Sequence, residues 1–285
     1  MLFYIFLSQF VYCVTSESQR GSKQLRFELP TPDIGLEEYV YNNQKAFERT
    51  NANDPYSVIA RYEAEWPCLW GMEVVGDVRG TNAVDGWKFT CGIPKIRNPC
   101  IVYSFGSNGN FAFEAGLLKK NRLCEIYVFD KDDYTDSISQ WFPVHTDVES
   151  LSSRVKFQRA YIGSTEDKTS DPPKRNLAGI MRDLHHDHID VLKVDIEGSE
   201  FDIFKKRAGD LPSVGQLLVE VHLSGRVKSD LAQYQELFDY VEGCGLRLFH
   251  KEVNAKFNVN CVELSFIQRH WHPAKKSYHC DKGAT

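Results

Sequence analysis

From Cys100 onward, short apolar segments alternate with longer amphipathic ones. The apolar segments are rich in β-branched and aromatic residues, which favour strands, and they lie at residues 100–105, 125–130, 155–162, 189–195, 216–222, 246–251 and 261–267. Helices are expected between them, at about residues 110–120, 199–207 and 229–242. This alternation predicts an α/β domain in which helices cover both faces of a parallel sheet.

The last two predicted strands differ from the others in how they are connected. Only residues 252–260 join them, which leaves no room for a helix of useful length. Parallel neighbours need a long crossover, whereas antiparallel neighbours do not. We therefore predict that the seven-stranded sheet ends in an antiparallel hairpin.

The N-terminal residues have a different pattern. Residues 2–14 form an apolar run of thirteen that only Ser8 and Gln9 interrupt. A bilayer span needs about 20 residues, so the run better fits a secretory signal, here residues 1–16, although no Lys or Arg precedes it. A buried first helix is the alternative. No stable membrane span is expected once the signal is cleaved.

The rest of the chain divides by composition into three parts. Residues 17–98 are predicted to be an N-terminal extension or cap. Within it, residues 17–35 are expected to be a mobile lead-in, residues 36–50 have a helical stripe, and residues 55–98, without a clear period, are expected to be irregular and pinned by disulfides. Residues 99–268 form the α/β domain, and the basic residues 269–285 are predicted to be a mobile tail. Asp190 and Asp202 are expected to face solvent. The chain has 285 residues, 42% of them hydrophobic, which suffices for a full core.

Charge and cysteine usage narrow the function classes. The net charge is −5 and no basic run follows a nucleic-acid backbone, so no nucleic-acid partner is expected. Seven cysteines remain after the signal, and none forms a Cys-x-x-Cys pair, which argues against a zinc site of that kind. Disulfides in an oxidising compartment fit this count, with Cys124 and Cys261 as buried thiols in the alternative.

The loop after the first strand, "SFGSNGNFAFE", is a candidate binding loop. Gly106 and Gly109 let the backbone approach a ligand closely, with Asn108 between them. The helix that follows directs its free N–H groups at the same place, where they suit a carboxylate. A plain tight turn explains the two glycines equally well.

The end of the second strand strengthens the binding hypothesis. Asp130 lies twenty-four residues after Gly106, near the spacing at which an acid accepts hydrogen bonds from both hydroxyls of a ribose. A surface acid at a strand end is the alternative. The Gly-x-Gly-x-x-Gly pattern of dinucleotide sites is absent, which favours S-adenosylmethionine over NAD.

These segments, together with "HIDVLKVDIEGSEFDIF", "QLLVEVHL" and "CVELSFI", resemble the methyltransferase domain of the secreted methyltransferase-like protein 24 group. That group is itself similar to FkbM-type O-methyltransferases. The resemblance covers about residues 60–270, and "KVDIEGSE" is its most specific element. It implies a Rossmann-like methyltransferase fold that uses S-adenosylmethionine. Many such enzymes bind the cofactor's ammonium group through an acid where this chain has Ser104; Glu114 either compensates or is only a helix-start acid.

Asp195 is the strongest candidate for the chemistry. It ends the fourth strand, next to the predicted methyl end of the cofactor, where it could orient a hydroxyl, act as a base or bind a metal. Glu197 is a second candidate, whereas Glu200 is either functional or only a helix-start residue. His222 is the predicted base, because histidine titrates near neutrality. Glu220 lies two residues before His222, so a metal bound by Asp195 and Glu220 is the alternative. No set of three clear oxygen ligands is visible, so no metal is expected.

Two functions remain open. The first is O-methylation of a small-molecule or glycan hydroxyl by an S-adenosylmethionine-dependent enzyme that is secreted or resident in the lumen of the secretory pathway. The second is a binding protein that keeps the methyltransferase fold without catalysis. Ser104 in place of an acid favours the second, whereas Asp130, Asp195 and His222 together favour the first.

Overall fold

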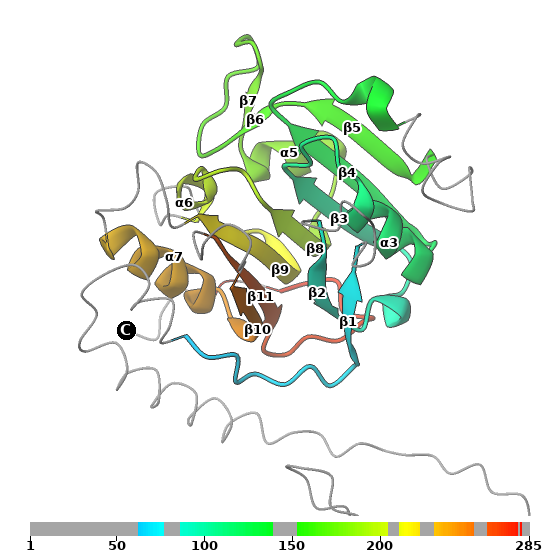
Figure 1. Ribbon diagram of the computed structural model, residues 1–285, viewed down its shortest axis with the longest axis vertical. Coiled ribbons are helices and arrows are strands. Elements are labelled where there is room, and N and C mark those ends of the chain that lie inside the picture. The colour runs from blue at the N-terminus through cyan, green and yellow to red at the C-terminus, as the bar shows by residue number, and fades with distance from the viewer. Residues whose placement is uncertain are drawn as a thin grey trace, which may run out of the picture. The chain divides into compact units, whose positions relative to one another are not determined.

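A seven-stranded sheet forms the centre of the computed structural model (Figure 1). The structure describes residues 62–76, 86–138, 153–204, 211–222, 231–253, 261–278 and 280; the predicted signal at residues 1–16, the lead-in and the helical stripe lie outside these ranges. The strands, in their order across the sheet, are β10 (Leu246–Val253), β11 (Cys261–Gln268), β9 (Ser213–His222), β8 (His188–Val194), β3 (Cys100–Phe105), β4 (Cys124–Asp130) and β5 (Val155–Arg159).

The strand directions confirm the predicted Rossmann-like methyltransferase sheet. β3 pairs in parallel with β4 and β8, and the next pairs outward, β4 with β5 and β8 with β9, are also parallel. β11 runs antiparallel to both β10 and β9, so the predicted terminal hairpin is present. The predicted fifth strand therefore pairs with the last strand in the sequence, which places distant residues side by side.

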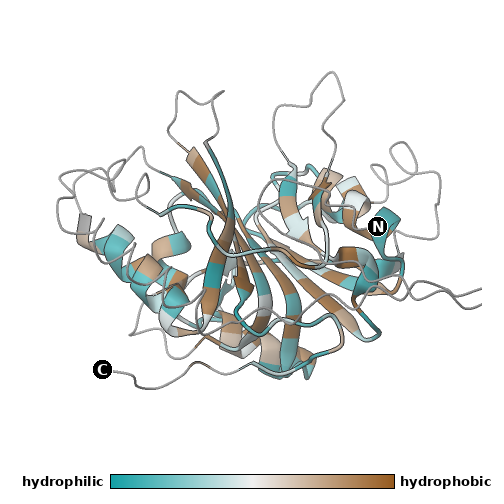
Figure 2. Cartoon of the chain, turned by 90° about the horizontal axis from the view of Figure 1, so that it is seen from below, coloured by the Kyte–Doolittle hydropathy of each residue, from teal (hydrophilic) through white to brown (hydrophobic). Residues whose placement is uncertain are grey.

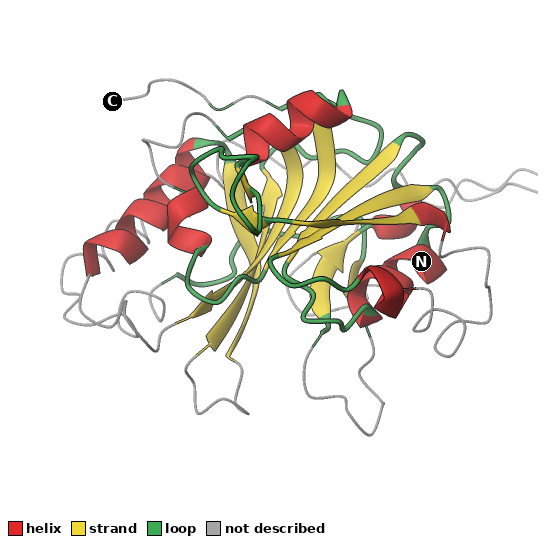
Figure 3. Cartoon of the chain, turned by 90° about the horizontal axis from the view of Figure 1, so that it is seen from above, coloured by secondary structure: helices red, strands yellow, loops and turns green. Residues whose placement is uncertain are grey.

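Helices cover both faces of the sheet (Figure 3). One core contains side chains of α5 (Leu177–Leu184), α6 (Glu200–Ile203) and α7 (Leu231–Gly243); the other contains those of α3 (Ala112–Lys120) and of the 3-10 helix η2 (Ile93–Lys95). Alternation along β3 explains the two cores, because Tyr103 and Phe105 enter the first and Val102 the second. The strands are accordingly apolar along most of their length (Figure 2).

Two elements differ from the predicted ones. The predicted strand 155–162 is interrupted at Ala160, since β5 ends at Arg159 and Tyr161–Ile162 form β6, which pairs with β7 (Lys174–Arg175). Helix α5 was not predicted, although the chain holds a start signal for it. The Asn176 side chain accepts a hydrogen bond of 2.7 Å from the Gly179 N–H, which is the contact of a helix N-cap.

The described part of the extension is ordered on the sheet rather than irregular. β1 (Met72–Val75) and β2 (Lys88–Cys91) form an antiparallel hairpin, and a disulfide joins Cys68 to Cys91. The backbone of Cys91 exchanges two hydrogen bonds, of 2.9 and 2.7 Å, with the side-chain amide of Gln216 in β9. Satisfying a buried amide in this way fixes the hairpin to the sheet.

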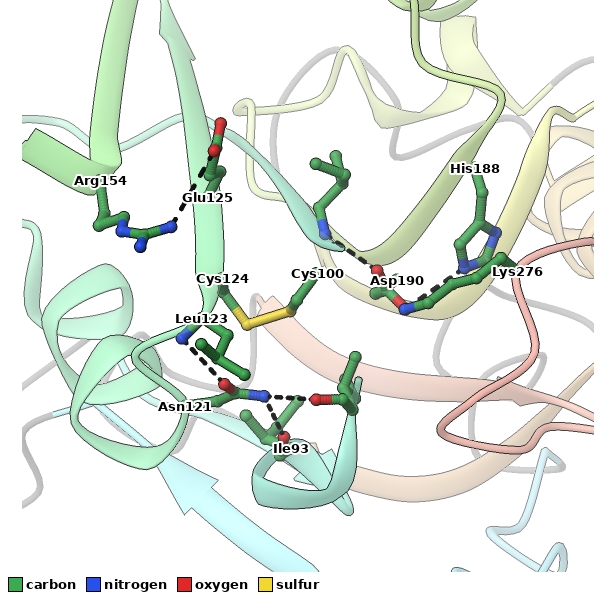
Figure 4. Close-up of a disulfide and its surroundings, with 12 residues drawn as sticks. Ile93, Cys100, Asn121, Leu123, Cys124, Glu125, Arg154, His188, Asp190 and Lys276 are labelled. Carbon is green, nitrogen blue, oxygen red and sulfur yellow. Dashed lines mark hydrogen bonds and ion pairs between the residues drawn. A yellow bond between two sulfur atoms is a disulfide. The ribbon is translucent and has the colours of Figure 1, made fainter. Parts of the chain in front are cut away.

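The C-terminal segment corrects the prediction of a mobile tail. Trp271 and Tyr278 are buried, and Cys280 forms a disulfide with Cys244. Lys276 lies 2.5 Å from Asp190, which is only 3% exposed instead of facing solvent (Figure 4). Residues 269–278 and 280 are therefore held against the start of β8.

A third disulfide joins the first residues of β3 and β4, Cys100 and Cys124 (Figure 4). Cys124 is thus not a free thiol. Cys261 is the one free thiol among the cysteines that the structure describes, and it is buried as predicted. Among the described residues, no helix is both long and apolar enough to cross a membrane.

Candidate functional site

A cavity of about 460 Å³ opens at the carboxyl ends of β3, β4 and β8. The strand order reverses here, because the chain leaves β3 for β4 on one side and later returns to β8 on the other. In open α/β sheets this is the usual place for a ligand. Five of the predicted site residues line the cavity: Gly106, Asn108, Asp130, Asp195 and Glu197.

The loop after β3 has the left-handed backbone that its glycines permit. Gly106 has a φ of 80°, and a Cβ added to it would lie 1.7 Å from the carbonyl oxygen of Asp195. The glycine is therefore required so that this loop can pass the end of β8. Gly109, with a φ of 71°, lies against the Tyr134 ring and is not among the residues that line the described cavity.

Asp130 connects this loop to the end of β4. Its Oδ2 accepts hydrogen bonds from the N–H groups of Ser107, at 2.7 Å, and Asn108, at 2.9 Å. Its Oδ1 accepts one from the Asp132 N–H at 3.1 Å. The residue is 7% exposed and lines the cavity, so it is not a solvated surface acid. The Ser107 hydroxyl donates a further, longer bond of 3.3 Å to Oδ2. A carboxylate oxygen has about two acceptor sites, so the capacity for a ligand lies on Oδ1, which accepts the one bond from Asp132.

Ser104 does not lie where the sequence predicted. Its side chain is fully buried and donates a hydrogen bond of 2.6 Å to Glu114 in α3. Burial raises the pKa of Glu114 above its ordinary value, against the opposing effects of Lys193 and of this hydrogen bond. Neither residue is among those that line the described cavity, so the pair fixes α3 beneath the loop. The assignment of Ser104 to cofactor contact is therefore not supported.

Asp195 lies directly after β8, between two lysines. Its carboxylate is 3.5 Å from the Lys88 ammonium and 3.7 Å from that of Lys193. Burial tends to raise the pKa of Asp195, but the surrounding positive charges, led by Lys88, outweigh it and lower the pKa to about 2. Asp195 is therefore ionised at neutral pH and can accept a hydrogen bond from a hydroxyl group.

Lys88 was not identified from the sequence. Its side chain is 1% exposed; it is hydrogen-bonded to Glu263 of β11 and lies 3.8 Å from Glu220 of β9. Burial alone lowers the pKa of Lys88, but the three carboxylates around it outweigh burial and raise the pKa. The available signal was a charged residue inside each of two apolar strands, "KFTC" and "CVELSFI".

His222 ends β9 and contacts two glutamates. Its Nδ1 lies 2.7 Å from Glu200, which is fully buried, and its Nε2 lies 3.6 Å from Glu197. Burial lowers the pKa of His222, but the hydrogen bond to Glu200 and the nearby carboxylates outweigh it and raise the pKa to about 9. The ring therefore carries a proton at neutral pH, which disfavours the predicted neutral base. It also lies outside the lining of the described cavity.

The two glutamates have different environments. Glu200 also accepts a hydrogen bond of 3.3 Å from the Ile196 N–H, so it is more than a helix-start residue. The Glu197 side chain is 82% exposed and lines the cavity. Its φ of 55° is uncommon for a residue other than glycine, and such strain is concentrated at functional sites.

Comparison with known proteins assigns the chain to a family. Residues 33–268 match a family described as a methyltransferase domain. The chain belongs to this methyltransferase family. The chain also aligns with the human protein named probable methyltransferase-like protein 24, at 27% identity over 62% of this chain and 52% of the relative. The rat protein of the same name is 26% identical over 60% and 51%.

The predicted resemblance to the methyltransferase-like protein 24 group is confirmed by these matches. The chain spans about half the length of the curated relatives that it matches. Solved structures resemble it more distantly. The methyltransferase FkbM from Methylobacillus flagellatus is 17% identical, with a TM-score of 0.40, over 58% of this chain and 42% of that one. A Methanococcus jannaschii fibrillarin pre-rRNA processing protein is 13% identical, with a TM-score of 0.41, over 62% and 69%.

Proposed function

We propose that this methyltransferase transfers the methyl group of S-adenosylmethionine to a hydroxyl group of a small molecule or glycan. Family membership supports methyl transfer, and the arrangement of Asp130 carries the choice of cofactor. Asp130 both holds the loop after β3 and faces the cavity at the switch point of the sheet. This is the position from which a carboxylate binds the hydroxyl pair of a ribose.

The residues around the cavity fit the cofactor. A volume of about 460 Å³ lies within the range of sites for small ligands. Apolar surface for the adenine ring of the cofactor is supplied beside the Asp130 carboxylate by Phe129, Ala160 and Ile162. Asp195 and Lys193 line the cavity as well, at the end of β8. When bound there, S-adenosylmethionine supplies an electrophilic methyl group on a sulfonium sulfur.

Asp195 orients the acceptor in this proposal. It stays ionised beside Lys88 and Lys193, and it accepts a hydrogen bond from the acceptor hydroxyl so that the oxygen faces the methyl group. As the new C–O bond forms, the bond from the methyl carbon to sulfur would break and the thioether S-adenosylhomocysteine would leave, and the hydroxyl proton would become far more acidic than a carboxylic acid. A carboxylate with a pKa of about 2 can therefore receive it, and Glu197, at the cavity wall, is a second acceptor.

The proposed location is the lumen of the secretory pathway or the extracellular space. Three disulfides are of the kind that persist in oxidising compartments. The predicted signal at residues 1–16 agrees with this location. A nucleic-acid substrate remains disfavoured, because the net charge is −5 and the cavity is bordered by carboxylates.

Isothermal titration of the disulfide-bonded protein with S-adenosylmethionine tests the cofactor proposal. We expect saturable binding of one equivalent, and NAD should give none. Label from methyl-labelled S-adenosylmethionine should then appear in an ether of a hydroxyl-bearing acceptor, screened from phenols, sterols and glycans. Absence of cofactor binding would refute the proposal, whereas binding without transfer to any acceptor supports the alternative, a binding protein that has kept the fold and lost catalysis.

A further inference from the structure

The register between β9 and β11 brings two cross-strand pairs together on one face of the sheet. Glu220 lies opposite Glu263, and His222 lies opposite Cys261. Opposed residues of antiparallel strands project from the same face, with Cβ atoms about 5 Å apart. The two carboxylates of the first pair already contact the ammonium group of Lys88. The second pair presents a nitrogen and a sulfur.

Three of these side chains converge as a ligand set. One ligand atom from each of Glu220, His222 and Cys261 lies within 4.8 Å of the other two. Tetrahedral zinc, with bonds of about 2.0–2.3 Å, needs ligand atoms about 3.5 Å apart. Small side-chain rotations on two paired strands supply that difference. A mixed set of one thiolate, one imidazole and one carboxylate suits Zn²⁺ better than Mg²⁺ or Ca²⁺, which take oxygen ligands.

Glu200 provides independent support for a metal. It is fully buried and lies 2.7 Å from His222 Nδ1. A carboxylate that accepts the Nδ1 proton fixes the ring and leaves Nε2 as the ligand atom, which is the usual arrangement behind a metal-bound histidine. On the other side of the ring, Nε2 lies 3.6 Å from Glu197, whose strained backbone places it at the cavity wall.

The charge of the cluster also leaves room for a divalent cation. Among the described residues of this cluster, five carboxylates accompany three cationic side chains; the carboxylates belong to Asp195, Glu197, Glu200, Glu220 and Glu263, and the cations are Lys88, Lys193 and His222, whose Nε2 proton a metal would displace. The Cys261 thiol is hydrogen-bonded to Glu220, and a metal would replace its proton between the same two groups.

We infer that Glu220, His222 and Cys261 form a site for one zinc ion beside the cavity, with Glu200 as the carboxylate that positions His222. Glu197, which lines the cavity, lies 3.6 Å from His222 Nε2, so a fourth position on this side of the ion would be the one reached from the cavity. There, in a step that rests on the proposed function, the ion binds the oxygen of the acceptor hydroxyl and makes its proton easier to remove. This site differs from the sequence-based expectation of no metal, which considered Cys-x-x-Cys pairs and sets of oxygen ligands but not a mixed set from two strands.

Metal binding is measured directly on the full chain with its disulfides intact. After treatment with a chelator and its removal, titration with zinc alone should show one equivalent bound. Cobalt(II) in place of zinc should give the intense thiolate-to-metal absorption of a cysteine ligand. Cys261→Ser should abolish that absorption, and Cys261→Ser or His222→Gln should weaken zinc binding more than about 100-fold, whereas Glu200→Gln should weaken it about 10- to 100-fold.

His185→Gln is the matched control, because His185 is exposed and lies just before the amino end of β8, whereas His222 lies at the carboxyl end of the parallel strand β9. The His185→Gln protein should bind zinc with the affinity of the wild type. Absence of saturable zinc or cobalt binding by the wild-type protein, or unchanged binding by Cys261→Ser, overturns the inference; the first result needs no variant to fold. S-adenosylmethionine titration of the same samples keeps this outcome separate from a failure of the proposed function, since Cys261 does not line the described cavity.

Discussion

Replacing Asp130 by asparagine should weaken cofactor binding far more than it weakens the fold. The asparagine oxygen can take the place of Oδ2 and keep the hydrogen bonds from Ser107 and Asn108. Its NH₂ group then replaces Oδ1, so the bond from the Asp132 N–H is lost. One lost hydrogen bond costs about 0.5–1.5 kcal/mol of unfolding free energy.

The effect on binding is larger, because the acceptor for the ribose hydroxyls loses its charge. A hydrogen bond to a charged group contributes about 1.5–3 kcal/mol, which corresponds to a dissociation constant about 10- to 150-fold higher. Isothermal titration with S-adenosylmethionine measures this constant, and chemical denaturation measures the free energy of unfolding. Asp130→Ala should also raise the dissociation constant, and it should lower the free energy of unfolding by about 1–3 kcal/mol, since the buried Ser107 N–H then lacks its acceptor.

Asp132→Asn is the matched control. Asp132 is two residues away and its side chain is 59% exposed, paired with Lys131 outside the sheet. The affinity of this variant for S-adenosylmethionine should stay within about twofold of that of the wild type, since an exposed ion pair contributes little free energy. A folded Asp130→Asn protein with wild-type affinity would remove Asp130 from the cofactor site and refute the reasoning above.

Three further predictions concern the buried charges and the compartment. Lys88→Met should lower the free energy of unfolding by about 3–5 kcal/mol in chemical denaturation, because it leaves buried carboxylates uncompensated. The double variant Lys88→Met/Glu263→Gln should recover part of this loss; equal free energies of unfolding for the single and the double variant would contradict the prediction. The pKa of Glu114 is raised in the folded state above its ordinary value of 4.5, so folding takes up a proton and stability falls as the pH rises from about 4.5 to that raised value. The Glu114→Gln variant should lack this fall in stability. If the free energy of unfolding of the variant depends on pH as that of the wild type does, the assignment to Glu114 is wrong. Protein from culture medium should begin near Glu17 in N-terminal sequencing, with Cys261 the one of its cysteines that alkylates after denaturation; recovery with Met1 retained and every thiol reactive would exclude secretion.

The sequence by itself determined the strands and the residues at their ends. β3, β4, β8 and β9 are continuous apolar segments because both faces of a parallel sheet are covered, and such a pattern is readable locally. The carboxyl ends of parallel strands meet at one edge, so Asp130 and Asp195 could be assigned to one site before their distance was known.

Only the tertiary structure decided which charges are partners. Lys88 meets Glu263 and Asp195 because the N-terminal hairpin lies on the sheet, and Cys261 meets His222 because the last strand inserts between β9 and β10. Neither contact can be predicted from the local pattern of hydrophobic and polar residues. The same holds for Lys276 beside Asp190: a basic segment has the same composition whether it is solvated or paired with a buried acid, and only the position of that acid in the folded chain separates the two.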